Sequence, residues 1–172
     1  MSGHDTVSDA IEEHQQRLTR YATRLLGDRA LAAEMVQESF ARLQEEATSN
    51  GSPPNTKAWL YRVVRNLSID HLRRAARFST PDDPNWMARV VSKHTDSGGD
   101  PSILAEKKEE QTMVLESVDR LPPRQREAVR LKFQEGLTYA EIGQVTDQPI
   151  TTVGWLLHEA ITTLRKQLAT VQ

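Results

Sequence analysis

The sequence contains no cysteine, which excludes disulfide bonds and metal sites built on thiolates. Its apolar residues never form an uninterrupted run of the roughly 18 positions that a membrane-spanning helix needs. The first residues, MSGHDTVSDAIEEHQQ, are polar and acidic, whereas a secretory signal peptide is basic and then apolar. We therefore expect a cytoplasmic protein without membrane insertion, and with no resident metal or cofactor.

The chain also lacks an overall surplus of positive charge. Its formal net charge is −2 and its calculated pI is about 6.2, which argues against a protein that coats nucleic acid indiscriminately. Any binding to nucleic acid must therefore be local or depend on a partner. The 172 residues, of which 37% are hydrophobic, are enough for one domain or two small ones.

The most strongly patterned stretch covers residues 57–77, KAWLYRVVRNLSIDHLRRAAR. It contains no glycine or proline, so nothing in it interrupts a helix. Its apolar residues recur at spacings of three and four, which predicts a helix that buries one stripe. The stripe consists of Leu60, Val63, Val64, Leu67 and Leu72, with Trp59 beside it.

The other faces of this predicted helix are strongly basic. Six cations stand against the single acid Asp70, so the local charge is 6 − 1 = +5 in a chain of net charge −2. The cations are Lys57, Arg62, Arg65, Arg73, Arg74 and Arg77. A solvated helix face and a nucleic-acid contact fit this pattern about equally well, and nearby Trp59 and Tyr61 are suited to unstacked bases. The place of Trp59 beside the apolar stripe favours a core role for its ring.

Two more helices are predicted before the basic stretch, over residues 9–26 and 28–47. The exposed side of the second helix carries Glu34, Gln37, Glu38 and Arg42. Residues 48–56 are predicted to form a loop, because they contain Asn-Gly and Pro-Pro pairs. Asn55 or Thr56 is expected to cap the basic helix.

A flexible linker is predicted at residues 79–101, where proline, glycine, serine and aspartate replace the helical pattern. It divides the chain into a first domain at residues 1–78 and a second at residues 102–172. Four apolar residues inside the linker form either a short docked turn or a loose apolar patch. They are Trp86, Met87, Val90 and Val91.

The second domain is predicted to contain four helices, the last two of which form a helix-turn-helix. The expected bounds are 102–119, 123–135, 138–145 and 149–168. Thr138 and Glu141 have the spacing of a capping box at the start of the third of these helices. The apolar residues expected to face each other across the turn are Ile142, Val145, Val153 and Leu157.

Three motifs, in a consistent order and spacing, resemble a known family. They are AEMVQESFARL (33–43), AWLYRVVRNLSIDHLRR (58–74) and LPPRQREAVRLKFQEGLTYAEIGQV (121–145). Over nearly the whole chain the sequence resembles the extracytoplasmic-function (ECF) sigma factors of bacterial RNA polymerase. The resemblance implies an all-α protein whose first domain binds the polymerase clamp and recognises and melts the -10 promoter element. The second domain would bind the polymerase flap and read the -35 element.

The resemblance also implies which residues carry these contacts. The residues that match the polymerase-binding helix are Glu34, Gln37, Glu38 and Arg42. Those that match the -10 reading loop and helix are Ser49, Asn50, Asn55, Lys57, Tyr61, Arg62, Arg65, Asn66, Arg73 and Arg74. A polar loop beside a basic helix can hold a flipped base while arginines bind the backbone, so the physical interpretation agrees.

The second domain departs from the family pattern in its recognition helix. Where the family usually carries a lysine and two arginines, this chain has Gly154, Leu156 and Glu159. Without cations to neutralise phosphates, we expect weak binding to duplex DNA. The residues left to contact DNA or a protein partner are Gln148, Thr151, Thr152, Trp155, Leu156 and His158. Trp155 and Leu156 form either an apolar contact patch or an enlargement of the core.

Other classes of function remain to be weighed. An enzyme is disfavoured, because the acid–histidine pairs Asp70–His71 and His158–Glu159 are adjacent in sequence and diverge on a helix. A polymerase-binding adaptor, or a helix-turn-helix regulator that does not itself specify a promoter, is the alternative to a sigma factor. The expected partners are core RNA polymerase, promoter DNA, and an anti-sigma factor or another DNA-targeting protein.

Overall fold

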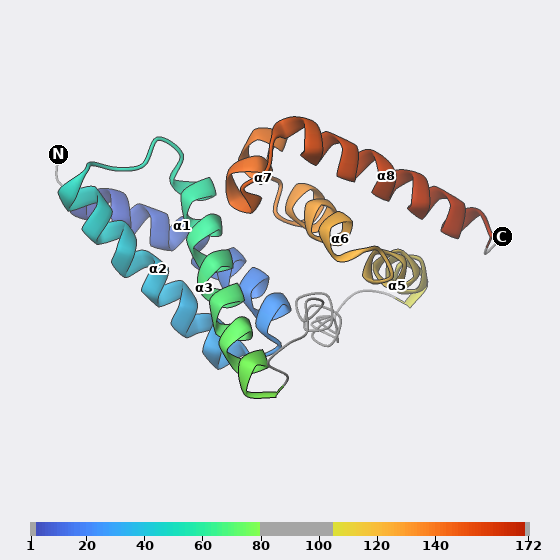
Figure 1. The fold of residues 1–172 in the computed structure, drawn as a ribbon, viewed down its shortest axis with the longest axis horizontal. Helices are drawn as coiled ribbons and strands as arrows, with labels where there is room; N and C mark the ends of the chain where they lie inside the picture. The colour runs from blue at the N-terminus through green and yellow to red at the C-terminus, as the bar shows by residue number, and fades with distance from the viewer. Residues whose placement is uncertain (1–2, 80–104, 171–172) are drawn as a thin grey trace. The chain divides into compact units, whose positions relative to one another are not determined.

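The computed structural model describes residues 3–79 and 105–170, with side chains from 7–76 and 109–170. Within those ranges the chain forms helices and turns without any strand, which confirms the all-α prediction. The described helices fall into two groups, α1 to α3 and α5 to α8 (Figure 1), and packing contacts join α1, α2 and α3 in the first and α5, α6 and α8 in the second. The linker predicted at 79–101, with its apolar residues, lies outside the described residues except for Ser79.

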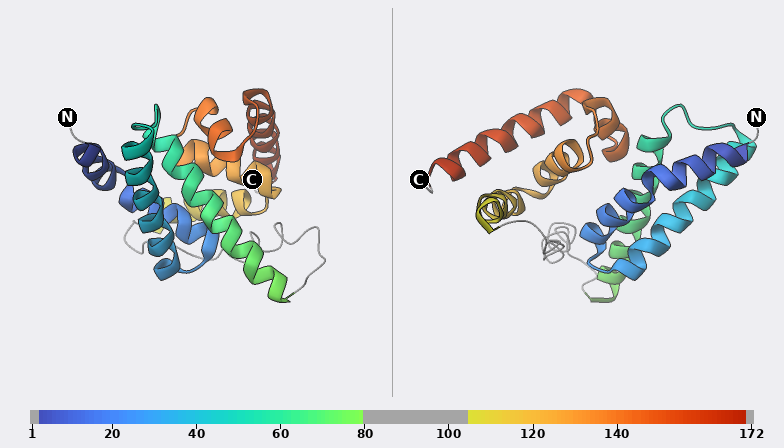
Figure 2. Two further views of the ribbon diagram at one scale, coloured as in Figure 1. Left: turned by 60° about the vertical axis from the view of Figure 1, so that its left-hand side comes forward. Right: turned by 180° about the vertical axis from the view of Figure 1, so that it is seen from behind.

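The first group consists of α1 (Gly3–Leu26), α2 (Arg29–Ser49) and α3 (Thr56–Ser79). Each of the three packs on the other two, and Figure 2 shows them from two further sides. The structure begins α1 six residues before the start predicted at residue 9, and Val7 of this added stretch is buried.

Local signals in the sequence account for the ends of these helices. Gly27 has φ = 70° and follows the last residue of α1, a conformation that glycine adopts without strain. Asp28 caps α2, because its side chain accepts a hydrogen bond from the Leu31 N–H at 3.0 Å. The Asn55 side chain accepts one from the Ala58 N–H at 3.0 Å, which confirms the N-cap predicted for the basic helix.

The second group begins with α5 (Ala105–Asp119) and α6 (Pro123–Val129). α6 continues into η1 (Arg130–Gln134), a turn of π-helix, so the helix predicted at 123–135 changes its winding partway. The wider turn leaves Leu131 buried while the Phe133 side chain is 64% exposed. Such turns are rare and interrupt the regular α-helical spacing, which is why periodicity did not indicate this one.

The helix-turn-helix consists of α7 (Tyr139–Thr146) and α8 (Ile150–Ala169). Thr138 and Glu141 form the predicted capping box: the Thr138 N–H donates to Glu141 Oε2 at 2.8 Å, and the Glu141 N–H donates to Thr138 Oγ1 at 3.2 Å. The residues predicted to face each other are all buried, namely Ile142, Val145, Val153 and Leu157. The predicted helix-turn-helix is therefore confirmed.

Gly143 allows the turn between α7 and α8 to close tightly. The Gln148 N–H donates to the Gly143 carbonyl at 2.9 Å. A Cβ atom on Gly143 would meet the Gln148 carbonyl oxygen at 2.7 Å, closer than real Cβ contacts. Gly154 in α8 differs, because a Cβ there would meet only the Tyr139 ring, at 3.8 Å.

These two glycines give a matched test of the turn. Gly143→Ala is expected to lower the unfolding free energy by about 1–3 kcal/mol, because the added methyl overpacks the backbone of the turn. Gly154→Ala is expected to raise it by up to about 1 kcal/mol, since alanine is the better helix former and has room. Urea unfolding followed by circular dichroism measures both, and equal midpoints for the two variants would contradict the account of the turn.

Candidate nucleic-acid interface

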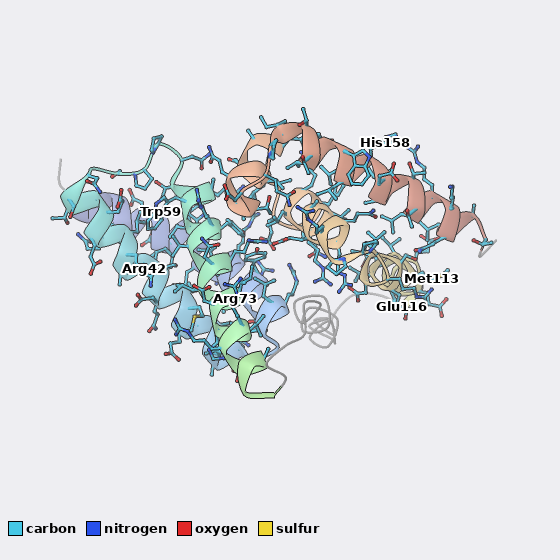
Figure 3. The ribbon with its side chains drawn as sticks, in the orientation of Figure 1. Arg42, Trp59, Arg73, Met113, Glu116 and His158 are labelled. Atoms are coloured by element: carbon cyan, nitrogen blue, oxygen red, sulfur yellow. The ribbon has the colours of Figure 1, made fainter. Side chains whose placement is uncertain are left out.

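The exposed face of α3 carries the basic residues singled out in the sequence. Arg62, Asn66, Asp70 and Arg74 follow one another at a spacing of four, so they share one face, and Arg73 is exposed beside them. The opposite face is buried through Leu60 and Val64, among others. The labelled side chains of Trp59 and Arg73 can be followed along α3 in Figure 3. α3 therefore has one face in the core and one cationic face in solvent.

Three of the predicted α3 contacts are not fully exposed. Lys57, Trp59 and Arg65 are half-buried along the edges of the helix. For Trp59 this agrees with the preference for a packing role. Lys57 and Arg65 lie beside the exposed cationic face, at half-buried positions where a long side chain can bury its stem and keep its charge in water.

The prediction that Tyr61 contacts DNA is wrong for this structure. Its side chain is only 1% exposed. Its ring packs edge-on against Tyr21 of α1, with ring centroids 5.2 Å apart and planes at 63°. A stacking platform for bases must present its face to solvent, so Tyr61 serves to pack α3 on α1.

The loop before α3 holds the remaining residues predicted at the -10 site. Ser49 is the exposed last residue of α2, and Asn50 is its exposed C-cap. Asn50 donates from its backbone to the Glu46 carbonyl at 2.8 Å and from Nδ2 to Glu46 Oε1 at 3.2 Å. Because Asn55 caps α3, its Oδ1 already accepts a hydrogen bond from the Ala58 N–H. The loop is thus polar, and anchored at both ends by its own asparagines.

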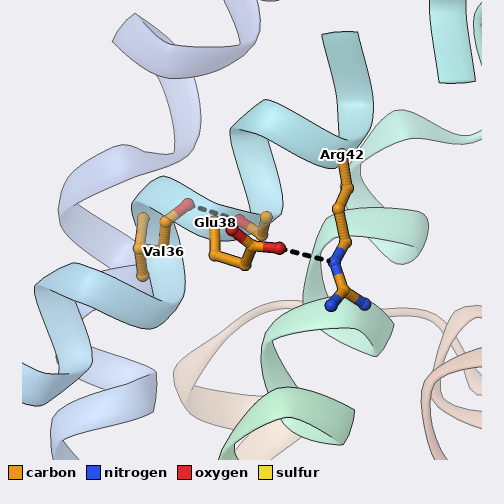
Figure 4. A network of polar contacts seen from close by, with 4 residues as sticks. Val36, Glu38 and Arg42 are labelled. Atoms are coloured by element: carbon orange, nitrogen blue, oxygen red, sulfur yellow. Dashed lines mark hydrogen bonds and ion pairs between the residues drawn. The ribbon is translucent and has the colours of Figure 1, made fainter. Parts of the chain in front are cut away.

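The four residues predicted to bind polymerase lie together on the exposed side of α2. They are Glu34, Gln37, Glu38 and Arg42. Arg42 Nε donates to Glu38 Oε1 at 3.0 Å, and both side chains are half exposed. Figure 4 shows this pair, together with the hydrogen bond from Ser39 to the Val36 carbonyl on the buried side of the helix. The face is polar and of mixed charge, and so chemically distinct from that of α3.

His14 of α1 is buried where α1 meets α3. Burial lowers its pKa from the ordinary value of 6.5, Glu13 opposes the shift, and Lys57 and Arg17 add to it. The imidazole is therefore kept neutral at the edge of the cationic region.

The helix-turn-helix presents a surface with an exposed indole and no cation in the first turns of α8. The Trp155 and Ile150 side chains are 59% and 54% exposed, and Thr151 and His158 are exposed as well, whereas Thr152 is half-buried. Leu156 is only 5% exposed, so its placement on a contact face is wrong and it belongs to the core.

Two cations approach this surface from outside α8. Lys132 of η1 lies over the Tyr139 ring, with its Nζ 5.5 Å from the ring centroid. The guanidinium of Arg124 lies beside the side-chain amide of Gln148, whose oxygen accepts from it when the amide is oriented to satisfy both groups. Gln148 is consequently engaged within the domain, which leaves Trp155, Thr151 and His158 as the most accessible of the predicted contacts.

Comparison with known proteins decides the family. The model of sigma-70 region 2 matches residues 10–78, and that of sigma-70 region 4 matches residues 111–164. The ECF RNA polymerase sigma factor SigL of Mycobacterium tuberculosis is 32% identical over 164 residues, which cover 91% of this chain and 85% of SigL. The chain belongs to the ECF RNA polymerase sigma factors.

This sigma factor spans only part of the length of some relatives. SigE of Mycolicibacterium smegmatis is 30% identical over 161 residues, which cover 94% of this chain but only 61% of SigE. In the solved structures, the sigma factor RpoE of Bartonella quintana, in complex with the anti-sigma factor NepR, has a TM-score of 0.65 at 18% identity. That alignment covers 96% of this chain and 98% of RpoE, and it shows the shared fold.

The described residues of this sigma factor contain neither a membrane-spanning helix nor a metal-ligand cluster. No helix among them is both long and apolar enough to cross a bilayer. No group of three or more histidine, aspartate or glutamate side chains among them is arranged to hold a metal ion.

Sequence analysis overlooked two features of this sigma factor. The contact between Tyr139 and Gly154 joins α7 to α8, and the helical glycine was its only visible signal. The lowered pKa of His14 arises from packing between helices far apart in the sequence. One signal for it was visible: residues 14–27 contain the arginines Arg17, Arg20 and Arg24 and no acid.

The buried histidine predicts how stability depends on pH. Because the pKa of His14 is lower in the folded than in the unfolded chain, its full contribution is present above about pH 6.5. That contribution is lost as the pH falls through the lowered value. The unfolding free energy should therefore drop between pH 7.5 and pH 5.5, and His14→Gln should make this drop smaller. Urea titrations at both pH values measure it, and an equal drop in parent and variant would contradict the assignment.

Proposed function

We propose that this sigma factor binds core RNA polymerase through the exposed face of α2 and presents the cationic face of α3 to the -10 promoter element. The observation that carries the proposal is the separation of these two faces on one domain that belongs to the sigma factors. On this proposal the chain directs promoter-specific transcription initiation by binding, with no catalytic step of its own. Because its proposed partner is core RNA polymerase, we propose that it acts in the cytoplasm.

The polymerase contact rests on α2. Glu34, Gln37, Glu38 and Arg42 are exposed, and the opposite face is fixed in the core by Val36, Phe40 and Leu43. An exposed polar face on a rigid helix loses little conformational entropy on binding. The Glu38–Arg42 pair holds both groups in place before the polymerase arrives.

The DNA contact rests on α3 and the loop before it. Exposed arginines neutralise phosphates and hold the backbone, while the amides of Asn50 and Asn66 can form hydrogen bonds with base edges. Because Tyr61 is buried, the polar loop rather than that ring must receive an unpaired base. Melting then follows from binding, because every contact made only by the separated strand favours the open state.

Two double variants separate the two surfaces. Glu34→Arg/Glu38→Arg should weaken binding to core polymerase at least tenfold, because it reverses two exposed charges and breaks the pair with Arg42. Arg62→Ala/Arg65→Ala should leave core binding intact and reduce open-complex formation at least tenfold. Gel filtration with core enzyme measures the first effect, and permanganate footprinting on a promoter located by mapping transcription starts measures the second.

A matched control for charge reversal is Asp9→Arg/Glu12→Arg, which changes two exposed acids of α1 by the same amount. It should bind core polymerase as the parent does. If it weakens binding as much as the α2 variant, or if the α3 variant melts the promoter normally, the surfaces are misassigned.

We propose that the second domain reads the -35 element weakly. The exposed start of α8 has no cation, and nearby Lys132 and Arg124 lie against Tyr139 and Gln148. Exposed Trp155 favours a second role for this face, as a contact for a protein partner. Because RpoE of Bartonella quintana was solved with an anti-sigma factor, an anti-sigma factor is one such partner that we propose for this chain.

The weak -35 contact predicts an unequal dependence on the promoter elements. Scrambling the upstream element should reduce runoff transcription far less than scrambling the -10 element. Gly154→Lys/Glu159→Arg adds +1 and +2, and should make duplex binding tighter and more salt-dependent, with a slope steeper by about 0.9 for each further phosphate that is neutralised. Leu156 is left unchanged, because an arginine there would be buried.

The control for that variant is Gly154→Ala/Glu159→Gln, which adds no positive charge beyond removing the acid. Trp155→Ala tests the partner role separately, since loss of the contact should change activity in cells, upward if the partner is an anti-sigma factor, while leaving runoff transcription with purified components unchanged. Strong, sequence-specific dependence of the unmodified holoenzyme on the upstream element at physiological salt would contradict the proposal for this domain.

A further inference from the structure

The cations of the first group of helices are not confined to α3. The second half of α1, residues 14–27, contains three arginines and no acid, whereas the acids of that helix lie before it. Together with the +5 of residues 57–77, this half-helix brings the local charge to 5 + 3 = +8 in a chain of net charge −2. Gathering like charges on neighbouring surfaces costs self-repulsion, which a bound polyanion relieves.

The structure places Arg17 of α1 at the edge of the contact with α3. Tyr21 and His14 lie on the side of α1 that faces α3, since Tyr21 packs on Tyr61 and His14 is influenced by Lys57. Arg17 stands three residues after His14 and four before Tyr21, so it lies on the same side of the helix. It is nevertheless exposed, which puts it at the edge of the α1–α3 contact.

On α3, Arg65 lies at the edge of the contact between α1 and α3. Arg65 follows Tyr61 by four residues and so lies on the same side of α3, and Arg62 is exposed next to it. Arg17 of α1 and Arg65 of α3 therefore flank the Tyr21–Tyr61 pair, and the cationic face of α3 continues onto α1. Arg20, also exposed, lies about 4.5 Å further along the axis of α1 than Arg17, next to it on the surface of the same helix.

An ordinary solvated helix face accounts for these arginines less well. Such a face usually alternates charges of opposite sign at spacings of three and four. Arg17 has Glu13 four residues before it, but Arg20 has no acid at either spacing. No ion pair to Arg17 or Arg20 occurs within the part of the chain that the structure describes. Arg24 in the last turn is explained by the helix dipole, but that effect does not reach Arg17, more than two turns from the end.

We propose that Arg17 and Arg20 of α1 form a second nucleic-acid-binding surface, which contacts backbone phosphates of promoter DNA next to the segment held by α3. The inference rests on the proposed function, because α3 must face DNA for α1 to meet the same molecule. Guanidinium groups suit this task, since they remain charged and bind phosphate in a bidentate geometry.

The test measures the salt dependence of DNA binding by holoenzyme assembled with core polymerase. The probes are a duplex that carries a promoter located by mapping transcription starts, and the same duplex with its -10 element replaced. The variants are Arg17→Ala/Arg20→Ala, the charge-preserving Arg17→Lys/Arg20→Lys, and Arg29→Ala, which removes an exposed cation at the start of α2. Gel filtration with core enzyme establishes that every variant still binds polymerase.

Phosphate contacts carry no sequence information, so the expected effect appears on both probes. The alanine double variant should reduce the slope of log Kobs against log salt by about 1.4–1.8, because each of two phosphates that is no longer neutralised accounts for about 0.7–0.9. The lysine variant and Arg29→Ala should each keep the slope within about half a unit of the parent.

Three results would overturn the proposal: an unchanged slope in the alanine variant, an equal fall in slope in the lysine variant, or an equal fall in Arg29→Ala. Failure of the proposed function has a different signature. In that case the parent holoenzyme would not distinguish the promoter from the duplex with the replaced -10 element. The salt slopes of the variants test the α1 contact on each duplex, whether or not the parent prefers the promoter duplex.

Discussion

The packing of α3 on α1 through Tyr21 and Tyr61 determines what the first group of helices can present. A helix with one apolar stripe and a charge of +5 has to bury the stripe and leave the charge in water. The edge-on contact between the two rings, with centroids 5.2 Å apart, fixes the rotation of α3 about its axis. Arg62 and Arg74 then point outward as a direct result of Tyr61 pointing inward. The cationic face is thus a consequence of how the core is packed.

Local signals predict much of this fold, and their failures have physical causes. The Asn55 cap and the Thr138–Glu141 capping box were predictable because each depends on residues three apart in the chain. The burial of Tyr61 and Leu156 was not, because it depends on which helix packs on each side. For Tyr61 the family pattern assigned an exposed contact to a side chain of the core; for Leu156 the sequence left a contact patch and the core open, and packing decides for the core.

The two domains present surfaces of different chemistry, cationic on α3 and apolar at the start of α8. α3 concentrates arginines that suit any phosphate backbone, so its contribution to promoter choice must come from the loop and from amides such as Asn66. α8 has given up the cations of its first turns and exposes an indole instead. On the proposals made above, such a sigma factor would depend mainly on its first domain for DNA, and its second domain would be available for a protein partner.

The contact between Tyr139 and Gly154 has a consequence for how such a protein changes over time. The ring rests on the backbone of α8 at ordinary van der Waals distance from where a Cβ would stand, while the core residues Val153 and Leu157 lie on another side of the same turns. The surface at position 154 is therefore independent of the residues that hold the helix in place. A side chain can therefore be gained or lost at position 154 without disturbing the core, so the chemistry of this surface can change between related proteins while the scaffold stays the same.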